Sequence, residues 1–267
     1  DVFTSHVINI YEGFSQKEKE GKVKIYMPCV DYYKEYVKEE SKKIPTRAQI
    51  EKTWDKVNAM SFCKEKDDII YDTFASMHVT EADAPDSLIS DASKNADTAI
   101  ITLSRFSAEG VDRKATPNDY YLSDVEKSLI DRVSSSFKKT VVVLNSGGIM
   151  DCEYFADNKN VSALIYGFQG GLEGGAVIAD IICGDVNPSG KMGDTIPKSY
   201  DFYQNAAEFP EGFEHLDYFD DIYVGYRYFE TIPGAYDKVR YEFGFGLSYT
   251  SFEFSGTLCG ESDGKII

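Results

Sequence analysis

The chain has 267 residues, of which 42% are hydrophobic, and a formal net charge of −17 at pH 7. This length predicts one large domain, or one domain with a short additional piece, and the hydrophobic content excludes a disordered chain. The acidic surface repels phosphate backbones, which disfavours nucleic acid as a partner. Neutral substrates such as sugars are compatible with this charge, as they are with most soluble proteins.

The cysteine and apolar patterns restrict the class of protein further. The five cysteines are widely spaced, form no CxxC pair and show no metal-ligand spacing with the three histidines. We therefore expect reduced core cysteines, no metal, and a reducing, cytoplasmic location. No apolar run reaches the length of about 18 residues that a membrane span needs, so we expect no membrane insertion. The opening sequence DVFTSHVINI has no signal-peptide pattern.

The first half of the chain mixes one clear strand pattern with charged segments. Residues 22–27 (KVKIYM) predict a strand, and the charged stretch 32–66 predicts helices and solvated loop, with a helical pattern at 46–60. A helix over residues 85–92 leads into a second predicted strand at 98–104 (TAIITLS).

From this strand onward, strands and helices alternate. A helix is predicted over residues 122–138, where Ser123 and Glu126 fit a capping box. Strands follow at 140–146 (TVVVLNS) and 163–168 (ALIYGF), and then a helix at 174–183 that Gly184 ends.

This alternation predicts a doubly wound α/β fold, a flavodoxin-like three-layer sandwich with a mostly parallel sheet. The strands 98–104 and 140–146 are almost continuously apolar, which favours burial on both faces. Beyond Gly184 the aromatic-rich chain has little periodicity, and we expect an irregular C-terminal wrap that ends at residue 249. Residues 250–267 begin like a strand (TSFEFSG) and then stop.

The glycine-rich turn GGLEGG places Glu173 between the strand 163–168 and the helix 174–183. Ligands of parallel α/β sheets bind beyond the carboxyl ends of the strands, so a functional carboxylate is expected at such a position. The alternatives are a structural glutamate in a tight turn and a phosphate-binding loop. The turn matches neither GxGxxG nor a P-loop, which disfavours phosphate.

A second charged cluster, RFSAEGVDR, follows the strand 98–104 and could lie beside Glu173. Its charged groups could hydrogen-bond sugar hydroxyls, or they could form ion pairs with one another at the surface. The cluster contains Arg105, Glu109, Asp112 and Arg113.

Six segments in register resemble the C-terminal α/β-sandwich domain of glycoside hydrolase family 3, the β-glucosidase and β-xylosidase family. These segments span about 160 residues, whereas residues 1–98 match less clearly. The matching segments are AIITLSRFSAEGVDR, YLSDVEKSLI, TVVVLNSGG, ALIYGFQGGLEGGAVIADIICGDVNPSGKM, DIYVGYRYFE and YEFGFGLSYTSFEF.

The resemblance implies a retaining β-glycosidase that acts on terminal β-D-glucosyl or xylosyl residues with two carboxylates. Glu173 occupies the position of the family's acid/base, and Arg105, Glu109, Asp112, Arg113 and Phe168 are the implied substrate-binding residues. The family often has Trp where Phe168 stands and Gln where Leu172 stands. The nucleophilic Asp belongs to a TIM-barrel domain and usually lies in a Ser-Asp-Trp stretch, which is absent from this sequence.

The resemblance also implies how the chain is organised and what it binds. Residues 1–249 would form the α/β domain, and 250–267 a linker or the truncated start of a fibronectin-III-like domain. The implied partners are a β-linked oligosaccharide or glycoside and the TIM-barrel domain of the same protein. A homo-oligomer is a further alternative, and we expect no cofactor. We expect the isolated chain to be inactive. The alternatives are a non-catalytic binding module on the same fold and an unrelated flavodoxin-like protein that binds a nucleotide or flavin.

Overall fold

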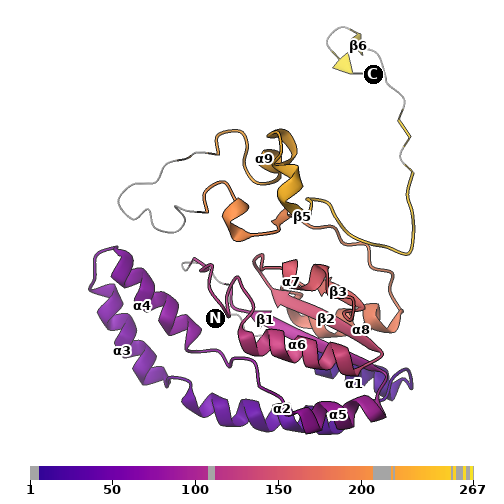
Figure 1. Cartoon of the computed structure of the whole chain (residues 1–267). Coiled ribbons are helices and arrows are strands. Elements are labelled where there is room, and N and C mark those ends of the chain that lie inside the picture. Colours follow the sequence, from indigo (N-terminus) through magenta and orange to yellow (C-terminus); the bar gives the residue numbers. More distant parts are fainter. Residues whose placement is uncertain are drawn as a thin grey trace.

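The structure is a computed structural model that describes residues 6–107, 112–206, 218, 220–253, 255–256, 261–262 and 265–266 (Figure 1). The α-helices within these residues are α1 (Ile10–Lys19), α2 (Met27–Glu40), α3 (Arg47–Asn58), α4 (Lys64–Ala75), α5 (Asp86–Asn95), α6 (Asp124–Ser136), α7 (Glu153–Ala156), α8 (Gly174–Cys183) and α9 (Tyr226–Thr231). The short 3-10 helices are η1 (Ser41–Lys43), η2 (Gly171–Glu173), η3 (Tyr200–Phe202) and η4 (Tyr236–Lys238). The strands are β1 (Thr98–Arg105), β2 (Lys139–Ser146), β3 (Ala163–Tyr166), β4 (Ile196–Pro197), β5 (Val239–Tyr241), β6 (Glu261–Ser262) and β7 (Lys265–Ile266).

The central sheet is parallel, with strand order β1-β2-β3. Thr98 lies opposite Lys139, and Val141 lies opposite Ala163. The three strands predicted from Thr98 onward are thus confirmed as neighbours. The core runs along the sheet, where Leu103, Val142 and Leu144 have no exposed surface.

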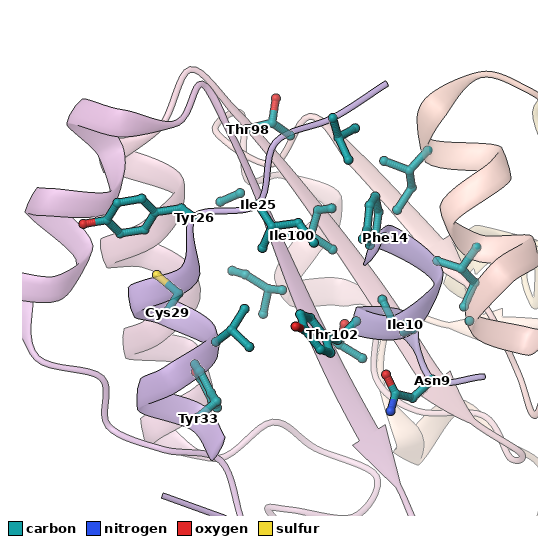
Figure 2. Close-up of a pocket in the computed structure, with 18 of the residues that line it drawn as sticks. Asn9, Ile10, Phe14, Ile25, Tyr26, Cys29, Tyr33, Thr98, Ile100 and Thr102 are labelled. Atoms are coloured by element: carbon teal, nitrogen blue, oxygen red, sulfur yellow. The ribbon is translucent and has the colours of Figure 1, made fainter. Parts of the chain in front are cut away.

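Helices cover both faces of the sheet. On one face, α6 contacts β1 and β2 and packs on α5, which in turn contacts α2. On the other face, α1 packs along α8. In Figure 2, α2 lies on one side of β1 and α1 on the other, so the sheet is the middle layer of three. The predicted three-layer α/β sandwich with a parallel sheet is therefore confirmed.

Local sequence signals explain the helix ends. Ser123 accepts a hydrogen bond from the backbone N–H of Glu126, whose side chain in turn accepts from the Ser123 backbone, as the predicted capping box requires. Gly184 has φ 80°, a left-handed conformation that glycine adopts without strain and that ends α8. The helices predicted at 46–60 and 85–92 correspond to α3 and α5.

The strand predicted at residues 22–27 is wrong. Gly21, with φ 76°, ends the turn that follows α1, and α2 begins at Met27 with Pro28 in its first turn. The backbone N–H of Ile25 donates to the Glu18 carboxylate and not to a neighbouring strand. The apolar side chains of this segment line a groove. An alternating apolar pattern occurs both in such a segment and in a paired strand, so the pattern alone does not distinguish the two.

The C-terminal part has only short regular elements. β4 and β5 form an antiparallel pair, and Ile196 of β4 is buried in the main core. Figure 1 shows this part, with α9, lying beyond the central sheet. Residues 251–253 and 255–256 form no strand, although the sequence TSFEFSG begins like one. The domain boundary expected at residue 249 stays a prediction.

Candidate functional site

Glu173 lies at the edge of the sheet where the parallel strands end. It closes the 3-10 helix η2 and immediately precedes α8, so it joins the carboxyl end of β3 to a helix N-terminus. Gly171 has φ 68°, which permits the sharp turn that the chain makes here. The Glu173 side chain is 54% exposed, so its carboxylate is accessible to a ligand from solvent.

The N-terminal segment holds this turn in place. The backbone N–H of Ile8 donates to the Leu172 carbonyl over 2.8 Å, and the Gly175 N–H donates to the Ile8 carbonyl over 3.0 Å. Gly13 and Gly175 let α1 and α8 approach each other closely: a Cβ on Gly175 would lie 2.1 Å from the Asn9 backbone. The position of Glu173 is therefore set partly by residues at the other end of the sequence.

His6 is a neighbour of Glu173 that the sequence does not reveal. Its Nε2 contacts Glu173 Oε1, and both side chains are about half exposed. The two residues are 167 positions apart, and no local pattern around His6 marks it as a partner of an acidic turn. The backbone hydrogen bonds of Ile8 and the packing of α1 on α8 bring them together.

Arg105, predicted to bind substrate, is buried in an ion pair with Glu126. Its guanidinium donates to both carboxylate oxygens of Glu126 over 2.7 and 2.8 Å, and both side chains are 4% exposed. Arg105 also donates to the backbone carbonyls of Asp119, Ser104 and Tyr121. A direct bond from Arg105 to a sugar would require one of these contacts to break, so the geometry favours the ion-pair alternative.

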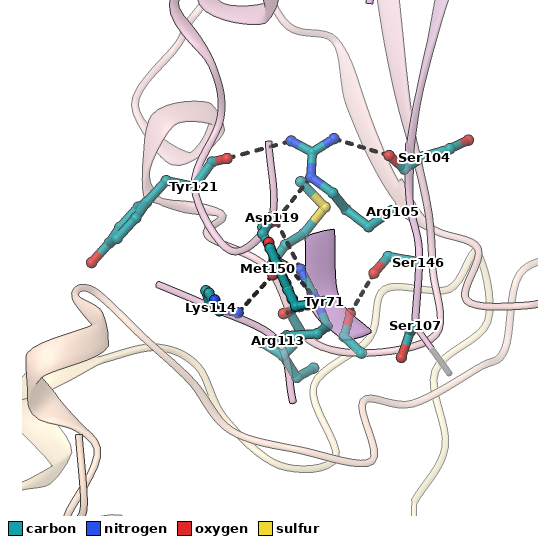
Figure 3. Close-up of polar contacts among 12 residues, drawn as sticks. Tyr71, Ser104, Arg105, Ser107, Arg113, Lys114, Asp119, Tyr121, Ser146 and Met150 are labelled. Carbon is teal, nitrogen blue, oxygen red and sulfur yellow. Dashed lines mark hydrogen bonds and ion pairs between the residues drawn. The ribbon is translucent and has the colours of Figure 1, made fainter. Parts of the chain in front are cut away.

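Arg113 is held in the same network. Its Nε donates to Asp119 Oδ1 over 2.6 Å, and its terminal nitrogens donate to the carbonyls of Ile149 and Asp119. Asp119 Oδ2 also accepts from Tyr71 Oη and from the Lys114 backbone N–H. These contacts tie the segment after β1 to α4 and to the loop after β2 (Figure 3).

The remaining candidates have different surroundings. Asp112 is exposed to solvent, and Glu109 lies outside the described residues. Phe168 is half-buried with φ 49°, a strained value for an aromatic residue, and its ring lies 4.6 Å from that of Tyr166. The neighbouring Gln169 donates to the Ser107 carbonyl over 3.2 Å, which brings the loops after β3 and β1 together. The substrate-binding roles of these residues stay predictions.

Burial shifts the pKa of two groups under the loop after β2. Desolvation raises the pKa of Tyr166, whose hydroxyl donates to the Gly148 carbonyl and accepts from the Met150 N–H. Desolvation also raises the pKa of Asp151. Tyr166 supports the loop and contacts the ring of Phe168, so it is a structural neighbour of the candidate site. The Asp151 carboxylate accepts a hydrogen bond from the Glu153 N–H at the start of α7.

Among the residues that the structure describes, no group of three or more His, Cys, Asp or Glu side chains is arranged to hold a metal ion. Within the same residues, no helix combines the length and the apolar character needed to cross a lipid bilayer.

The fold and site define a three-layer α/β domain that presents a glutamate at the ligand-binding edge of a parallel sheet. Over residues 4–249 the sequence matches the glycosyl hydrolase family 3 C-terminal domain. The chain belongs to this family, as its sequence motifs predict.

Relatives and solved structures of this family include three that cover most of the chain. β-Glucosidase A of Butyrivibrio fibrisolvens is 36% identical over 94% of this chain, which spans 29% of that protein. The structure of a β-glucosidase from Paenibacillus barengoltzii matches 94% of this chain with a TM-score of 0.73 and 28% identity, over 24% of its own chain. That of β-glucosidase 3B from Thermotoga neapolitana in complex with glucose matches 96% with a TM-score of 0.72 and 30% identity, over 32% of its own chain. The chain thus spans a third or less of each of these proteins.

Proposed function

We propose that this chain is the part of a retaining β-glycosidase that supplies the general acid/base, and that Glu173 is this residue. The proposed substrates are terminal β-D-glucosyl or xylosyl residues of oligosaccharides or glycosides. The observation that carries the proposal is the half-exposed Glu173 carboxylate on a glycine-rich turn at the carboxyl edge of the sheet, in a chain of this family.

A retaining mechanism needs a second carboxylate about 5–5.5 Å from the first. One carboxyl group attacks the anomeric carbon while the other protonates the leaving oxygen and later activates water. The proposed nucleophile belongs to a TIM-barrel domain outside this chain. The isolated chain is therefore expected to have no glycosidase turnover.

The second carboxylate would have a further role in the proposed mechanism. A general acid must carry its proton when the reaction starts. A negatively charged nucleophile nearby favours the protonated form of a carboxylic acid. The barrel domain would supply this charge.

The C-terminal segment offers a surface for such a domain. Several of its large apolar side chains are exposed, which is unusual for a surface that faces only water. The exposed residues are Tyr218, Ile222, Val224, Phe243, Leu247 and Tyr249. We propose this set as the docking face for the barrel domain.

The proposal is tested in a chimera in which residues 4–249 replace the matching region of the Butyrivibrio β-glucosidase A. Glu173→Gln should lower hydrolysis of β-glucosides with poor leaving groups by about 10²–10⁴-fold, because these substrates need protonation. Substrates with good leaving groups should be less affected, and azide should restore their turnover. The matched control, Glu65→Gln on the exposed start of α4, should retain the parent rate. Equal rates for both variants would assign the acid to another residue, with Glu109 as the next candidate.

The alternative is a non-catalytic binding or interaction module on the same fold. The ion pairs that occupy Arg105 and Arg113 are compatible with it, because they leave few charged groups of the second loop open to a substrate. In that case the unsubstituted chimera would bind glycosides or partners but show no hydrolysis. Cytoplasmic location and self-association of the chain stay predictions.

A further inference from the structure

The loops after β1, β2 and β3 meet at the side chain of Gln169, a residue that the sequence motifs do not single out. Gln169 lies in the loop after β3, shortly before Glu173. Its Nε2 donates to the Ser107 carbonyl, in the loop after β1, over 3.2 Å. A Cβ added to Gly147, directly after β2, would lie 2.7 Å from Gln169 Cδ, so the amide packs against this glycine. One side chain thus connects all three loops at the carboxyl edge of the sheet.

Gly147 is needed at this position for space and not for its backbone conformation. Its φ is not positive, so a residue with a side chain could adopt the same backbone angles. The three atoms nearest to an added Cβ are Cδ, Nε2 and Oε1 of Gln169, at 2.7, 2.8 and 2.9 Å. Because these distances are nearly equal, the flat face of the amide lies on Gly147. The edge of the amide, which carries its hydrogen-bonding atoms, is left uncovered by the glycine.

The Gln169 amide has hydrogen-bonding capacity that the fold does not use. A glutamine amide offers two N–H donors and one carbonyl acceptor. Within the described part of the chain, the Ser107 carbonyl is the only hydrogen-bond partner of this amide, and Gln169 is exposed to solvent. A polar group that the fold already holds in place loses little side-chain freedom when it binds a ligand. Arg105 and Arg113, by contrast, form ion pairs with internal partners.

The residue before Gln169 adds an aromatic ring to this loop. Phe168 has φ 49°, and strained values of this kind cluster at binding sites. Its ring contacts Tyr166, whose hydroxyl is hydrogen-bonded to the loop after β2, so the strained turn is held in place. An aromatic ring and a fixed amide, on the same loop as Glu173, are side chains suited to binding a sugar ring.

We propose that Gln169 binds a hydroxyl group of a leaving sugar and so determines which leaving groups this domain accepts. The inference rests on the proposed function, in which Glu173 protonates the leaving oxygen. A side chain on the same loop as this acid lies beside the leaving group. The free N–H and the carbonyl of the amide would bind hydroxyls of a second sugar, and would give no advantage to an apolar alcohol of the same size.

The test uses the chimera with the Butyrivibrio β-glucosidase A and two substrates, cellobiose and cyclohexyl β-D-glucoside. Both leaving groups are alkyl alcohols on a six-membered ring, but only that of cellobiose carries further hydroxyls. Gln169→Leu should lower kcat/KM for cellobiose by about two- to tenfold, the effect of one hydrogen bond, and leave that for the cyclohexyl glucoside unchanged. The matched control, Gln16→Leu on the exposed side of α1, should retain both values. An equal loss for the two substrates, or no loss for cellobiose, would overturn the proposal.

Gly147→Ala perturbs the same amide from the opposite side. The added Cβ has to displace only the end of a flexible side chain, so the fold should tolerate it. This variant should also lower kcat/KM for cellobiose selectively, and it should cause no further loss in the Gln169→Leu background, because both changes act on one contact. Gly193→Ala, which meets nothing within 4 Å, is the control. Fully additive losses would contradict the role of the amide.

The ratio of the two kcat/KM values separates this inference from the role of Glu173. Glu173→Gln should slow both substrates alike and leave the ratio unchanged, because both leaving groups need protonation. A slow Glu173→Gln variant together with an unchanged ratio in Gln169→Leu would overturn the sugar contact alone. A changed ratio in Gln169→Leu with no effect of Glu173→Gln would overturn only the proposed acid. If the chimera hydrolyses neither substrate, calorimetry gives the Kd of each, and equal effects of Gln169→Leu on the two Kd values would overturn the proposal.

Discussion

The loops that follow β1 and β3 lie at the same edge of the sheet but are built in opposite ways. The loop after β1 is rich in charge. Arg105 at the end of β1 and Arg113 in the loop form ion pairs with the buried side chains of Glu126 and Asp119. The loop after β3 has a single carboxylate, Glu173, on a glycine-rich turn, and this side chain stays half exposed. Within the described part of the charged cluster, the two arginines that look most like binding residues in sequence are therefore less accessible than Glu173, whereas Asp112 is exposed.

The two loops use charged side chains in different ways. A buried pair such as Arg105–Glu126 holds a loop in one conformation, because either charge left alone would be strongly destabilising. Glu173, whose turn is hydrogen-bonded to Ile8, stays about half exposed although it contacts His6, and this exposure is what the proposed acid/base role requires. Exposure thus separates the two loops better than the number of charged residues does.

The largest expected effect comes from breaking the buried pair. Arg105→Ala should lower the free energy of unfolding by roughly 3–5 kcal/mol, because Glu126 would remain buried without its partner. The control is Arg47→Ala, which removes an exposed pair with Glu51 and should cost less than about 1 kcal/mol. Urea denaturation followed by circular dichroism measures both. A loss below 1 kcal/mol for Arg105→Ala would contradict the structural role and reopen substrate binding.

The next largest loss of stability is expected at Gly175, where α1 packs against the helix that follows the Glu173 turn. Gly175→Ala places a Cβ 2.1 Å from the Asn9 backbone, so α1 and α8 must separate. The expected cost is about 1–3 kcal/mol. Gly174→Ala, one residue earlier, meets nothing within 4 Å and has helical angles, so it should be neutral or slightly stabilising. Thermal unfolding of the two variants compares them directly, and equal midpoints would show that the close approach of α1 and α8 is not required.

A smaller effect is expected at the exposed pair. His6→Ala removes the contact with Glu173, yet both side chains are about half exposed. The free energy of unfolding should therefore change by less than about 1 kcal/mol, in contrast to Arg105→Ala. The same urea titration provides the measurement. A loss comparable to that of Arg105→Ala would mean that the two loops do not differ as their exposure suggests.

The smallest expected effect is a pH-dependent change in stability that involves Asp185, which follows the C-terminal end of α8. Hydrogen bonds from Lys17 and then from Lys22 hold the pKa of Asp185 below its usual value of 3.8. A carboxyl group with a lowered folded-state pKa contributes stability above its unfolded value, and this contribution disappears as the pH falls through the folded-state pKa. Below about pH 3.8, the stability difference between the chain and Asp185→Asn should therefore shrink. Amide exchange in α1, measured for the chain and for Asp185→Asn at pH 6 and pH 3, gives the stability difference at each pH. A difference that does not change with pH would contradict the coupling of Asp185 to the two lysines.

Several elements are predictable because their signals are local. The capping box of Ser123 and Glu126, the left-handed Gly184 and the apolar runs of β1 to β3 each act within a few residues. Residues 22–27 were misleading because an apolar alternation can line a groove without pairing. The register of β1 with β2 and the partner of Arg105 depend on contacts 21 or more residues away, and no local pattern encodes them.

The family, the parallel α/β core and the position of Glu173 on a turn between a strand and a helix are all predictable from sequence. These depend on short motifs and on hydrophobic periodicity, which act through neighbouring residues. Three features emerge only from long-range packing: Arg105 is buried with Glu126, His6 contacts Glu173, and β1 pairs with β2 alone among the described residues. The reason is that burial and pairing arise from the packing of segments that are distant in sequence, and packing decides whether a charge stabilises the fold or faces a ligand.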